Sequence, residues 1–217
     1  MKIKGAIFDM DGTLLNSMDY WSCAFEEFLI KNGYTPEQDS NIKFLQMGMK
    51  QVWEYYKDNH NLTISFEETR RQIYDIVGAH YDTSVEAKDG VIQMLDKLYS
   101  AGVKMCLATA TDRDQVEKIL KKLNMEKYFS KIFTTAEVGV GKTSPLIYEL
   151  ALSHLGTKKD ETYIFEDAAY AMKTAYENGF WVVGVYDKNV LVPKERLLLH
   201  CHYFIDEDSK YNIDFLM

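Results

Sequence analysis

The chain has 217 residues, of which 47% are hydrophobic and 27% are charged, and its formal net charge is −8. This length suffices for one sizeable core, or for one domain that carries a smaller insertion, and a content of only three prolines argues against disorder. The acidic balance and the scattered basic residues argue against nucleic acid or an anionic membrane as the main partner.

Signal peptides, membrane spans and cysteine motifs have recognisable sequence patterns, and none of these patterns is found in the sequence. The start reaches Asp9 without the apolar stretch of a signal peptide, and no apolar run approaches the ~20 residues of a membrane span. Cys23, Cys106 and Cys201 are odd in number and far apart, which predicts reduced thiols without a disulfide or Cys-x-x-Cys metal site. We expect a cytoplasmic protein that acts as a monomer.

The first predicted element is a buried strand over Ile3–Phe8 that ends in Asp9-Met10-Asp11-Gly12-Thr13. Ligands of open α/β sheets bind where strands end, so Asp9 and Asp11 should face a crevice. Their charges repel unless a cation joins them, which implies a hard divalent ion. A calcium loop is excluded because its glycine would come sixth and here comes fourth. A plain strand-to-turn exit with solvated aspartates stays open as the alternative.

Residues from about Asn16 to Thr83 break the strand pattern and predict a helical insertion. One helix should begin after Ser17 and stop at Asn32-Gly33, a second should lie near Ser40–Tyr56, and a third should cover Glu67–His80. We predict a helical cap domain over residues 16–83, placed above the carboxyl edge of the sheet. Residues 1–15 and 84–217 would form the other domain.

From about Asp89 the pattern alternates between helices and strands, which predicts an α/β fold with a doubly wound parallel sheet and helices on both faces. Apolar spacing and turn residues set the expected bounds. The expected helices are Val91–Ala101, Asp112–Leu123, Pro145–Leu155 and Ala168–Asn178, and the expected strands are Val103–Ala108, Ile132–Phe133, Thr162–Phe165, Trp181–Tyr186 and Tyr203–Ile205.

Every strand-to-helix loop of such a sheet opens on the same edge as Asp9. The loop at Thr109, Ala110 and Thr111 offers a hydroxyl and free N–H groups that can cradle a phosphate, although a cap and turn is the commoner use of this pattern.

Two further loops supply charge. Lys142, in Gly139–Pro145, can neutralise carboxylates and an incoming phosphate, with a solvated loop lysine as the alternative. A nucleotide-binding phosphate loop is excluded because Ala136 stands where glycine is required. Glu166 and Asp167 follow an apolar strand and are better explained as magnesium ligands than as a helix cap, given the other acids on this edge.

Taken together, these motifs resemble those of the haloacid dehalogenase superfamily. Phe8–Leu14 is similar to its first motif, Thr109 to its second, Lys142 to its third and Glu166-Asp167 to its fourth, in the family's order and over essentially the whole chain. The resemblance is to the branch of phosphoglycolate phosphatase and β-phosphoglucomutase. It implies a Rossmann-like sheet with a mobile helical cap.

The resemblance also implies a magnesium-dependent phosphatase that acts on a small phosphorylated metabolite. Asp9 would be the nucleophile that becomes an aspartyl phosphate, and Asp11 would be the general acid and base. Magnesium would be held by Asp9, the backbone carbonyl of Asp11 and Asp167, with Glu166 as a nearby or direct partner. The substrate would contact core residues and cap residues, namely Thr109, Ala110, Lys142, Gly48, Lys50 and Gln51.

The same resemblance leaves other activities to compare. Dehalogenases lack an acid at the position of Asp11, so dehalogenation is disfavoured. β-Phosphoglucomutase has a histidine in place of Trp21 and an arginine in place of Gln51; without that arginine the clamp for a second phosphate is missing, so we favour hydrolysis over a sugar phosphomutase. A non-catalytic binding protein of the same fold is the remaining alternative, but all the motif acids and the lysine are present.

Overall fold

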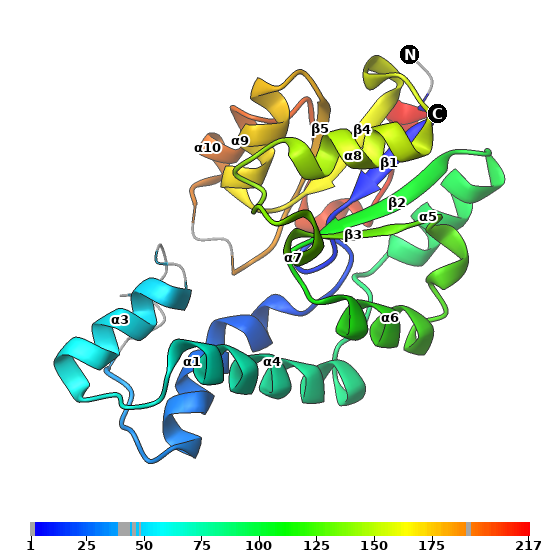
Figure 1. The fold of residues 1–217 in the computed structure, drawn as a ribbon. Coiled ribbons are helices and arrows are strands. Elements are labelled where there is room, and N and C mark those ends of the chain that lie inside the picture. The colour runs from blue at the N-terminus through cyan, green and yellow to red at the C-terminus, as the bar shows by residue number, and fades with distance from the viewer. Residues whose placement is uncertain (1–2, 39–43, 45–46, 48, 190–191) are drawn as a thin grey trace. The chain divides into compact units, whose positions relative to one another are not determined.

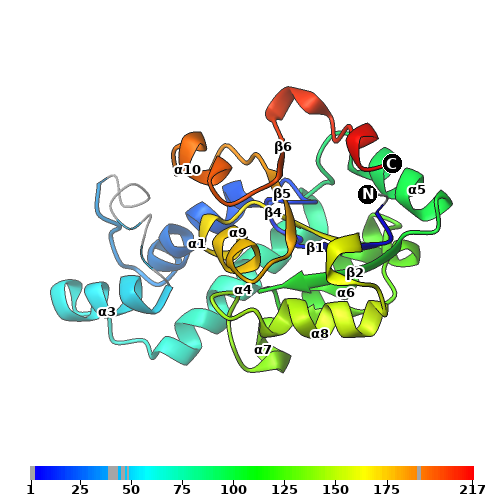
Figure 2. The ribbon, with the colours of Figure 1, turned by 90° about the horizontal axis from the view of Figure 1, so that it is seen from above.

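The computed structural model describes residues 3–38, 44, 47, 49–189 and 192–217. Within this part of the chain, one parallel sheet has the strand order β3-β2-β1-β4-β5-β6. Figure 2 shows β6, β5, β4, β1 and β2 following one another in this order. The strands are β1 (Gly5–Phe8), β2 (Lys104–Thr109), β3 (Ile132–Thr134), β4 (Thr162–Glu166), β5 (Trp181–Val185) and β6 (Tyr203–Ile205). The predicted fold class is confirmed.

The central strand β1 is buried along its whole length and sets the position of the site. Phe8 is in register with Leu107 of β2 and Phe165 of β4, and the rings of Phe8 and Phe165 stack with their centroids 4.4 Å apart. The three strands therefore end together, so Asp9, the residues after Thr109 and Glu166 reach the same edge. The strand order reverses at β1, which is the topological switch point where such sheets bind ligands.

Helices cover both faces of the sheet. In Figure 1, α8 lies on one side of β1, β2 and β3, and α6 lies on the other side. Strand residues such as Ile7, Cys106 and Ile164 pack with Ile147 of α8 and Met172 of α9 in one buried cluster, because alternate strand residues point to the same face. The helices of this part are α5 (Val91–Ser100), α6 (Arg113–Lys122), α7 (Thr135–Val138), α8 (Leu146–Leu155), α9 (Ala169–Glu177) and α10 (Lys194–Leu198).

The chain divides into two compact units. The sheet unit consists of Met1–Asn16 and Val85–Met217, and the helical unit is Ser17–Ser84. In the sheet unit, the two segments that lead to the helical unit are joined by backbone hydrogen bonds, from Asn16 N to Glu86 O at 2.9 Å and from Lys88 N to Leu14 O at 2.9 Å. The predicted domain ranges, 16–83 and the remainder, differ from these units by one residue at each boundary.

The helical unit contains α1 (Met18–Lys31), α3 (Met49–His60) and α4 (Phe66–Thr83). α1 and α4 are linked by a hydrogen bond from Trp21 Nε1 to the Tyr81 hydroxyl at 3.2 Å, and Ser65 caps α4 by accepting from Glu68 N. The helix predicted near Ser40–Tyr56 has wrong bounds. α3 ends four residues later, at His60, Phe44 lies in a turn, and residues 40–43, 45, 46 and 48 lie outside the described part.

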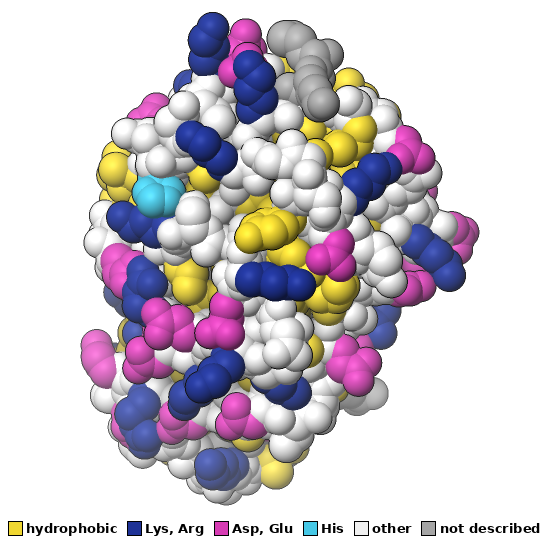
Figure 3. Space-filling view, turned by 90° about the vertical axis from the view of Figure 1, so that its right-hand side faces the viewer, with side chains coloured by type: hydrophobic (Ala, Val, Ile, Leu, Met, Phe, Trp, Pro, Cys, Tyr) yellow, Lys and Arg dark blue, Asp and Glu magenta, His cyan; other side chains and the backbone are white. Residues whose placement is uncertain are grey.

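Charged and hydrophobic side chains are mixed on one face of the molecule. On the face drawn in Figure 3, acidic and basic side chains are interspersed, with hydrophobic side chains between them. None of the helices in the described part of the chain has the length and apolar character needed to cross a membrane.

Candidate active site

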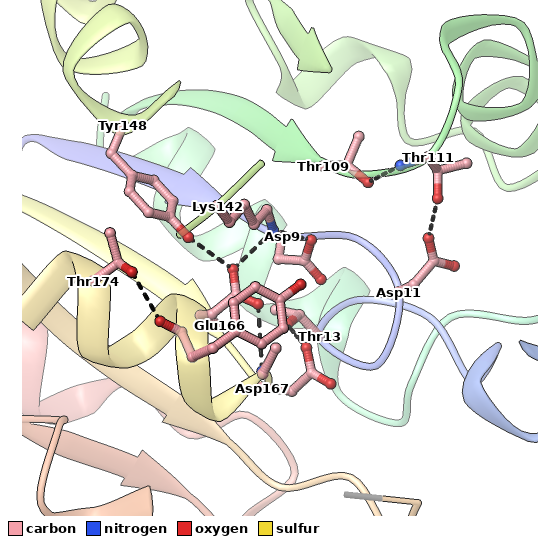
Figure 4. A network of polar contacts seen from close by, with 12 residues as sticks. Asp9, Asp11, Thr13, Thr109, Thr111, Lys142, Tyr148, Glu166, Asp167 and Thr174 are labelled. Atoms are coloured by element: carbon pink, nitrogen blue, oxygen red, sulfur yellow. Dashed lines mark hydrogen bonds and ion pairs between the residues drawn. The ribbon is translucent and has the colours of Figure 1, made fainter. Parts of the chain in front are cut away.

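A buried lysine joins two carboxylates at the carboxyl edge of the sheet (Figure 4). Asp9 follows β1, Glu166 ends β4 and Lys142 lies in the loop before α8. The Lys142 ammonium donates to Asp9 Oδ1 and, at 2.8 Å, to Glu166 Oε2. Their side chains are only 2%, 8% and 1% exposed for Lys142, Asp9 and Glu166, so water screens these charges weakly. Lys142 is therefore not the solvated loop lysine that the sequence left open.

A third carboxylate, from Asp167, completes an acidic cluster. Asp9, Glu166 and Asp167 each offer an oxygen, and these oxygens lie within 4.8 Å of one another. All three residues are buried, and Lys142 is the ammonium bonded to two of them. Three carboxylates around one lysine leave an excess of negative charge, and carboxylate oxygens are the ligands that Mg²⁺ prefers. The donor set therefore fits a hard divalent cation.

Burial and the crowded negative charge together shift the pKa values of the cluster. Burial and the charge of Glu166 raise the pKa of Asp9 to about 7, although Lys142 lowers it. Burial, Asp9 and Glu166 raise the pKa of Asp167 well above its ordinary value. Burial lowers the pKa of Lys142, but Asp9 and Glu166 outweigh that effect and hold it well above its ordinary value. Without further positive charge the cluster thus favours taking up protons, which is the behaviour of crowded buried carboxylates.

Asp11 faces a different loop from the acidic cluster. The Thr111 hydroxyl donates to Asp11 Oδ2 at 2.6 Å, and the Thr111 N–H donates to the Thr109 hydroxyl at 3.1 Å. In Figure 4, Asp9 lies between this group and Glu166. The chain can turn after Asp11 because Gly12 adopts a left-handed conformation, with φ at 79°. The Asp11 carboxylate is not part of the acidic cluster of the described residues, so its predicted metal contact through the backbone carbonyl stays a prediction.

The second loop presents one exposed residue between two buried threonines. Thr109 and Thr111 are 1% and 2% exposed, and Ala110 between them is exposed. The predicted phosphate contacts at Thr109 and Ala110 stay predictions, but the loop lies at the same edge as Asp9.

Three side chains donate hydrogen bonds to the acids, and the sequence did not predict these bonds. The Thr13 hydroxyl donates to Asp167 Oδ1 at 3.0 Å, and the Tyr148 hydroxyl donates to Glu166 Oε2 at 3.2 Å. Thr111, described above, binds Asp11. Thr13 and Thr111 belong to motif loops, and Tyr148 lies in the first turn of the helix after the lysine loop, so proximity along the chain was the available signal.

The predicted cap contacts lie in the helical unit. Lys50 and Gln51 are exposed in the first turn of α3, and Gly48 lies outside the described residues. Their contact with substrate stays a prediction.

Residues 6–185 match the family model of haloacid dehalogenase-like hydrolases. The chain belongs to this family. The matched range includes Asp9, Asp11, Thr109, Lys142 and the Glu166-Asp167 pair, and it ends with β5. The predicted family, the Rossmann-like fold and the assignment to a hydrolase of this family are confirmed.

Relatives of similar length include proteins named as phosphatases and as pyrophosphatases. A phosphorylated carbohydrates phosphatase of Thermotoga maritima is 23% identical over 177 residues, which cover 82% of each chain. A validoxylamine A 7'-phosphate phosphatase of Streptomyces hygroscopicus subsp. limoneus is 26% identical over 202 residues, which cover 90% of this chain and 92% of that protein. Pyrophosphatase PpaX of Halalkalibacterium halodurans is 27% identical over 172 residues, covering 78% and 77%.

Solved structures share the fold. CbbY of Rhodobacter sphaeroides in complex with phosphate has a TM-score of 0.79 at 19% identity, over 94% of this chain and 93% of that one. A predicted phosphoglycolate phosphatase of Haemophilus somnus has a TM-score of 0.81 at 18% identity, over 96% of each chain. At these identities the likeness supports the fold alone.

Proposed function

We propose that this hydrolase is a magnesium-dependent phosphatase that cleaves a small phosphomonoester through an aspartyl phosphate on Asp9. The observation that carries the proposal is the buried group of Asp9, Lys142, Glu166 and Asp167 at the switch point of the sheet. Their charges suit a site that must hold a dianionic phosphate beside carboxylates.

In the first step, a carboxylate oxygen of Asp9 forms a bond to phosphorus while the bond from phosphorus to the leaving oxygen breaks. A carboxylate suits this role because, unlike serine, it needs no base to remove a proton from it. Asp11 gives its proton to the leaving alkoxide. The Thr111 hydroxyl fixes the orientation of the Asp11 side chain at 2.6 Å, away from the cluster of charges around Asp9.

In the second step, Asp11 takes a proton from water, and that water attacks phosphorus. The bond from phosphorus to Asp9 breaks, which releases inorganic phosphate and restores both aspartates. General acid and base catalysis of this kind contributes ~10²–10⁴-fold in rate.

Magnesium would be held by Asp9, Asp167 and the backbone carbonyl of Asp11, with Glu166 nearby or bound directly. When bound, the ion supplies positive charge that offsets the negative charge of the phosphoryl oxygens. Lys142 keeps Asp9 in place and brings a second positive charge to the phosphoryl group, and Thr109 supplies a hydroxyl on the neighbouring loop.

Two of the relatives support the substrate class that we propose, because their names refer to phosphorylated carbohydrates and to validoxylamine A 7'-phosphate. We infer a small phosphorylated metabolite as the substrate, contacted by Thr109, Ala110 and Lys142 in the sheet unit. Lys50 and Gln51, with Gly48, would add contacts from the helical unit.

The test is release of inorganic phosphate from a panel of sugar phosphates, nucleotides, short phosphorylated acids and pyrophosphate. Wild-type protein should release phosphate with Mg²⁺ and lose this activity in EDTA, and Asp9→Asn should abolish it. Asp160→Asn, at an exposed position outside the site, is the matched control and should retain full activity. Equal turnover by Asp9→Asn and wild type would overturn the nucleophile. Isomerisation of a sugar phosphate without phosphate release would instead support the mutase.

A further inference from the structure

A buried chain of hydrogen bonds connects the C-terminal segment to the acidic cluster. The Tyr211 hydroxyl donates to the backbone carbonyl of Thr13, and the Thr13 hydroxyl donates to Asp167 Oδ1 at 3.0 Å. Tyr211 is 6% exposed, Thr13 0% and Asp167 3%. The connection therefore crosses the interior of the sheet unit, where a water molecule cannot readily take the place of a lost hydrogen-bond partner.

The backbone around Tyr211 is held in an uncommon conformation. Lys210 and Tyr211 both have positive φ angles, 42° and 54°, in the left-handed region that residues with a side chain rarely adopt. The segment also passes so close to Gly90 that a Cβ there would lie 2.2 Å from the Lys210 carbonyl oxygen. Such conformations persist only where the surrounding structure fixes them, and they recur near functional sites.

Apolar contacts fix the rest of the segment. Ile213 and Leu216 are each 1% exposed, and Ile3 N donates to Leu216 O at 3.3 Å, next to the start of β1. Tyr211 thus lies between Lys210, whose backbone packs against Gly90, and the buried residues Ile213 and Leu216. It lies beyond the range 6–185 that matches the family model, whereas Thr13 and Asp167 lie inside it.

We propose that Tyr211 is a positioning residue for the metal site and acts through Thr13. Its hydroxyl fixes the backbone of the loop after β1, and the Thr13 hydroxyl then fixes the rotation of the Asp167 carboxylate toward Asp9 and Glu166. This inference rests on the proposed function, in which Asp167 is a metal ligand. Residues that orient a ligand in this way commonly contribute ~10–100-fold to metal affinity.

A merely structural role would give a different result. If Tyr211 only anchored the C-terminal segment, removal of its hydroxyl would lower the unfolding temperature and leave the affinity of the folded protein for metal unchanged. Metal affinity measured without substrate therefore separates the two roles.

The experiment compares Tyr211→Phe with Tyr128→Phe, each of which removes one hydroxyl from a buried tyrosine of the sheet unit. The Tyr128 hydroxyl donates to Asp96 at 2.6 Å, outside the acidic cluster, so this variant is the matched control. Binding of Mn²⁺ to each full-length protein is followed by the electron paramagnetic resonance signal of the free ion, with competition by Mg²⁺, and folding is checked by circular dichroism. Tyr211→Phe should bind the ion about 10-fold more weakly than wild type, and Tyr128→Phe should bind it as wild type does.

Substitution at Thr13 tests whether Tyr211 acts through the Thr13 hydroxyl. Thr13→Val keeps the shape of the side chain and removes the donor, so it should weaken binding at least as much as Tyr211→Phe. Thr13→Ser keeps the donor and should restore most of the affinity. Equal weakening by Val and Ser would show that packing, not the hydrogen bond to Asp167, is responsible, and would overturn the inference.

The two proposals fail in different ways. If wild type binds Mn²⁺, Asp167→Asn does not, and Tyr211→Phe binds as wild type, the positioning role is overturned and the metal site stands. If wild type does not bind the ion, or Asp167→Asn binds it equally well, the metal site is overturned and this inference falls with it.

Discussion

Buried polar side chains are distributed unevenly between the two units. Among the described residues, ten buried polar or charged side chains lie in the sheet unit, and two, Ser17 and Thr69, lie in the helical unit. Burial of a polar group costs free energy unless it is bonded, and burial of a charge costs more. The sheet unit therefore contains groups whose burial is disfavoured unless neighbours compensate it, and Asp9, Lys142, Glu166 and Asp167 lie together where β1 and β4 end.

The helical unit is stabilised in a different way. Tyr56 is fully buried and its ring lies within 6 Å of those of Phe25, Phe44, Tyr55 and His60. The charged groups of the helical unit remain near water. In the pairs of Arg71 with Glu68 and Asp75, for example, the side chains are 40–60% exposed. Aromatic rings thus pack in the interior of this unit, whereas a charge network occupies the interior of the other.

The largest effect that this comparison predicts is the loss of stability when the positive charge of a buried lysine is removed. Lys142→Met would leave Asp9 and Glu166 buried beside Asp167 without their ammonium, which should lower the free energy of unfolding by about 3–5 kcal/mol. Arg71→Met is the matched variant, since Arg71 also joins two carboxylates, but at the surface, where it should change stability little. Urea unfolding in EDTA, followed by circular dichroism, measures both. Equal losses in the two variants would contradict the comparison.

A second buried pair tests whether the sheet unit depends on ion pairs other than those of Lys142. Lys88 Nζ lies 2.8 Å from Asp187 Oδ2 and also donates to Tyr186 O, and the two side chains are 11% and 6% exposed. Lys88→Met should destabilise the protein by about 3 kcal/mol, because Asp187 would be left buried without its partner and Asp167 would lose the Lys88 charge that lowers its pKa.

The double variant Lys88→Met, Asp187→Asn separates the pair from the packing of its members. The change of Asp187 to asparagine removes the stranded charge and keeps an oxygen that can accept from Asn189 N, as Asp187 does at 2.9 Å. The double variant should therefore be more stable than Lys88→Met alone. If the loss of stability in the double variant equals the sum of the losses in Lys88→Met and Asp187→Asn, the two residues do not stabilise the protein through their interaction.

Much of the sheet unit could be predicted from local sequence. The helices over Val91–Ser100 and Leu146–Leu155 and the strand over Trp181–Val185 lie within one residue of their predicted bounds, because apolar spacing and glycine at the helix end are local signals. The gathering of Asp9, Lys142 and Glu166 was also predictable, since parallel strands end at a common edge.

The rest depended on tertiary structure. No sequence pattern connects Tyr211 with Thr13, which are 198 residues apart, and no pattern distinguishes Asp187 from a surface aspartate. The bond between Asp11 and Thr111 depends on the conformations of two loops. The catalytic and substrate-binding roles assigned from the motifs stay predictions until the variants are measured.

The smallest effect concerns one of the two buried polar side chains among the residues that the structure describes in the helical unit. Thr69 in α4 is 0% exposed, and its hydroxyl has no hydrogen-bond partner among the described residues. Thr69→Val keeps the shape and removes an unsatisfied polar group, so it should raise the free energy of unfolding by about 1 kcal/mol. Thr162, equally buried in the sheet unit, donates to Lys158 O at 2.7 Å, and Thr162→Val should lower stability by about 1 kcal/mol. Urea unfolding of both variants gives the sign directly, and a loss of stability in Thr69→Val would mean that its hydroxyl is bonded in solution and that burial of polar groups is compensated in both units alike.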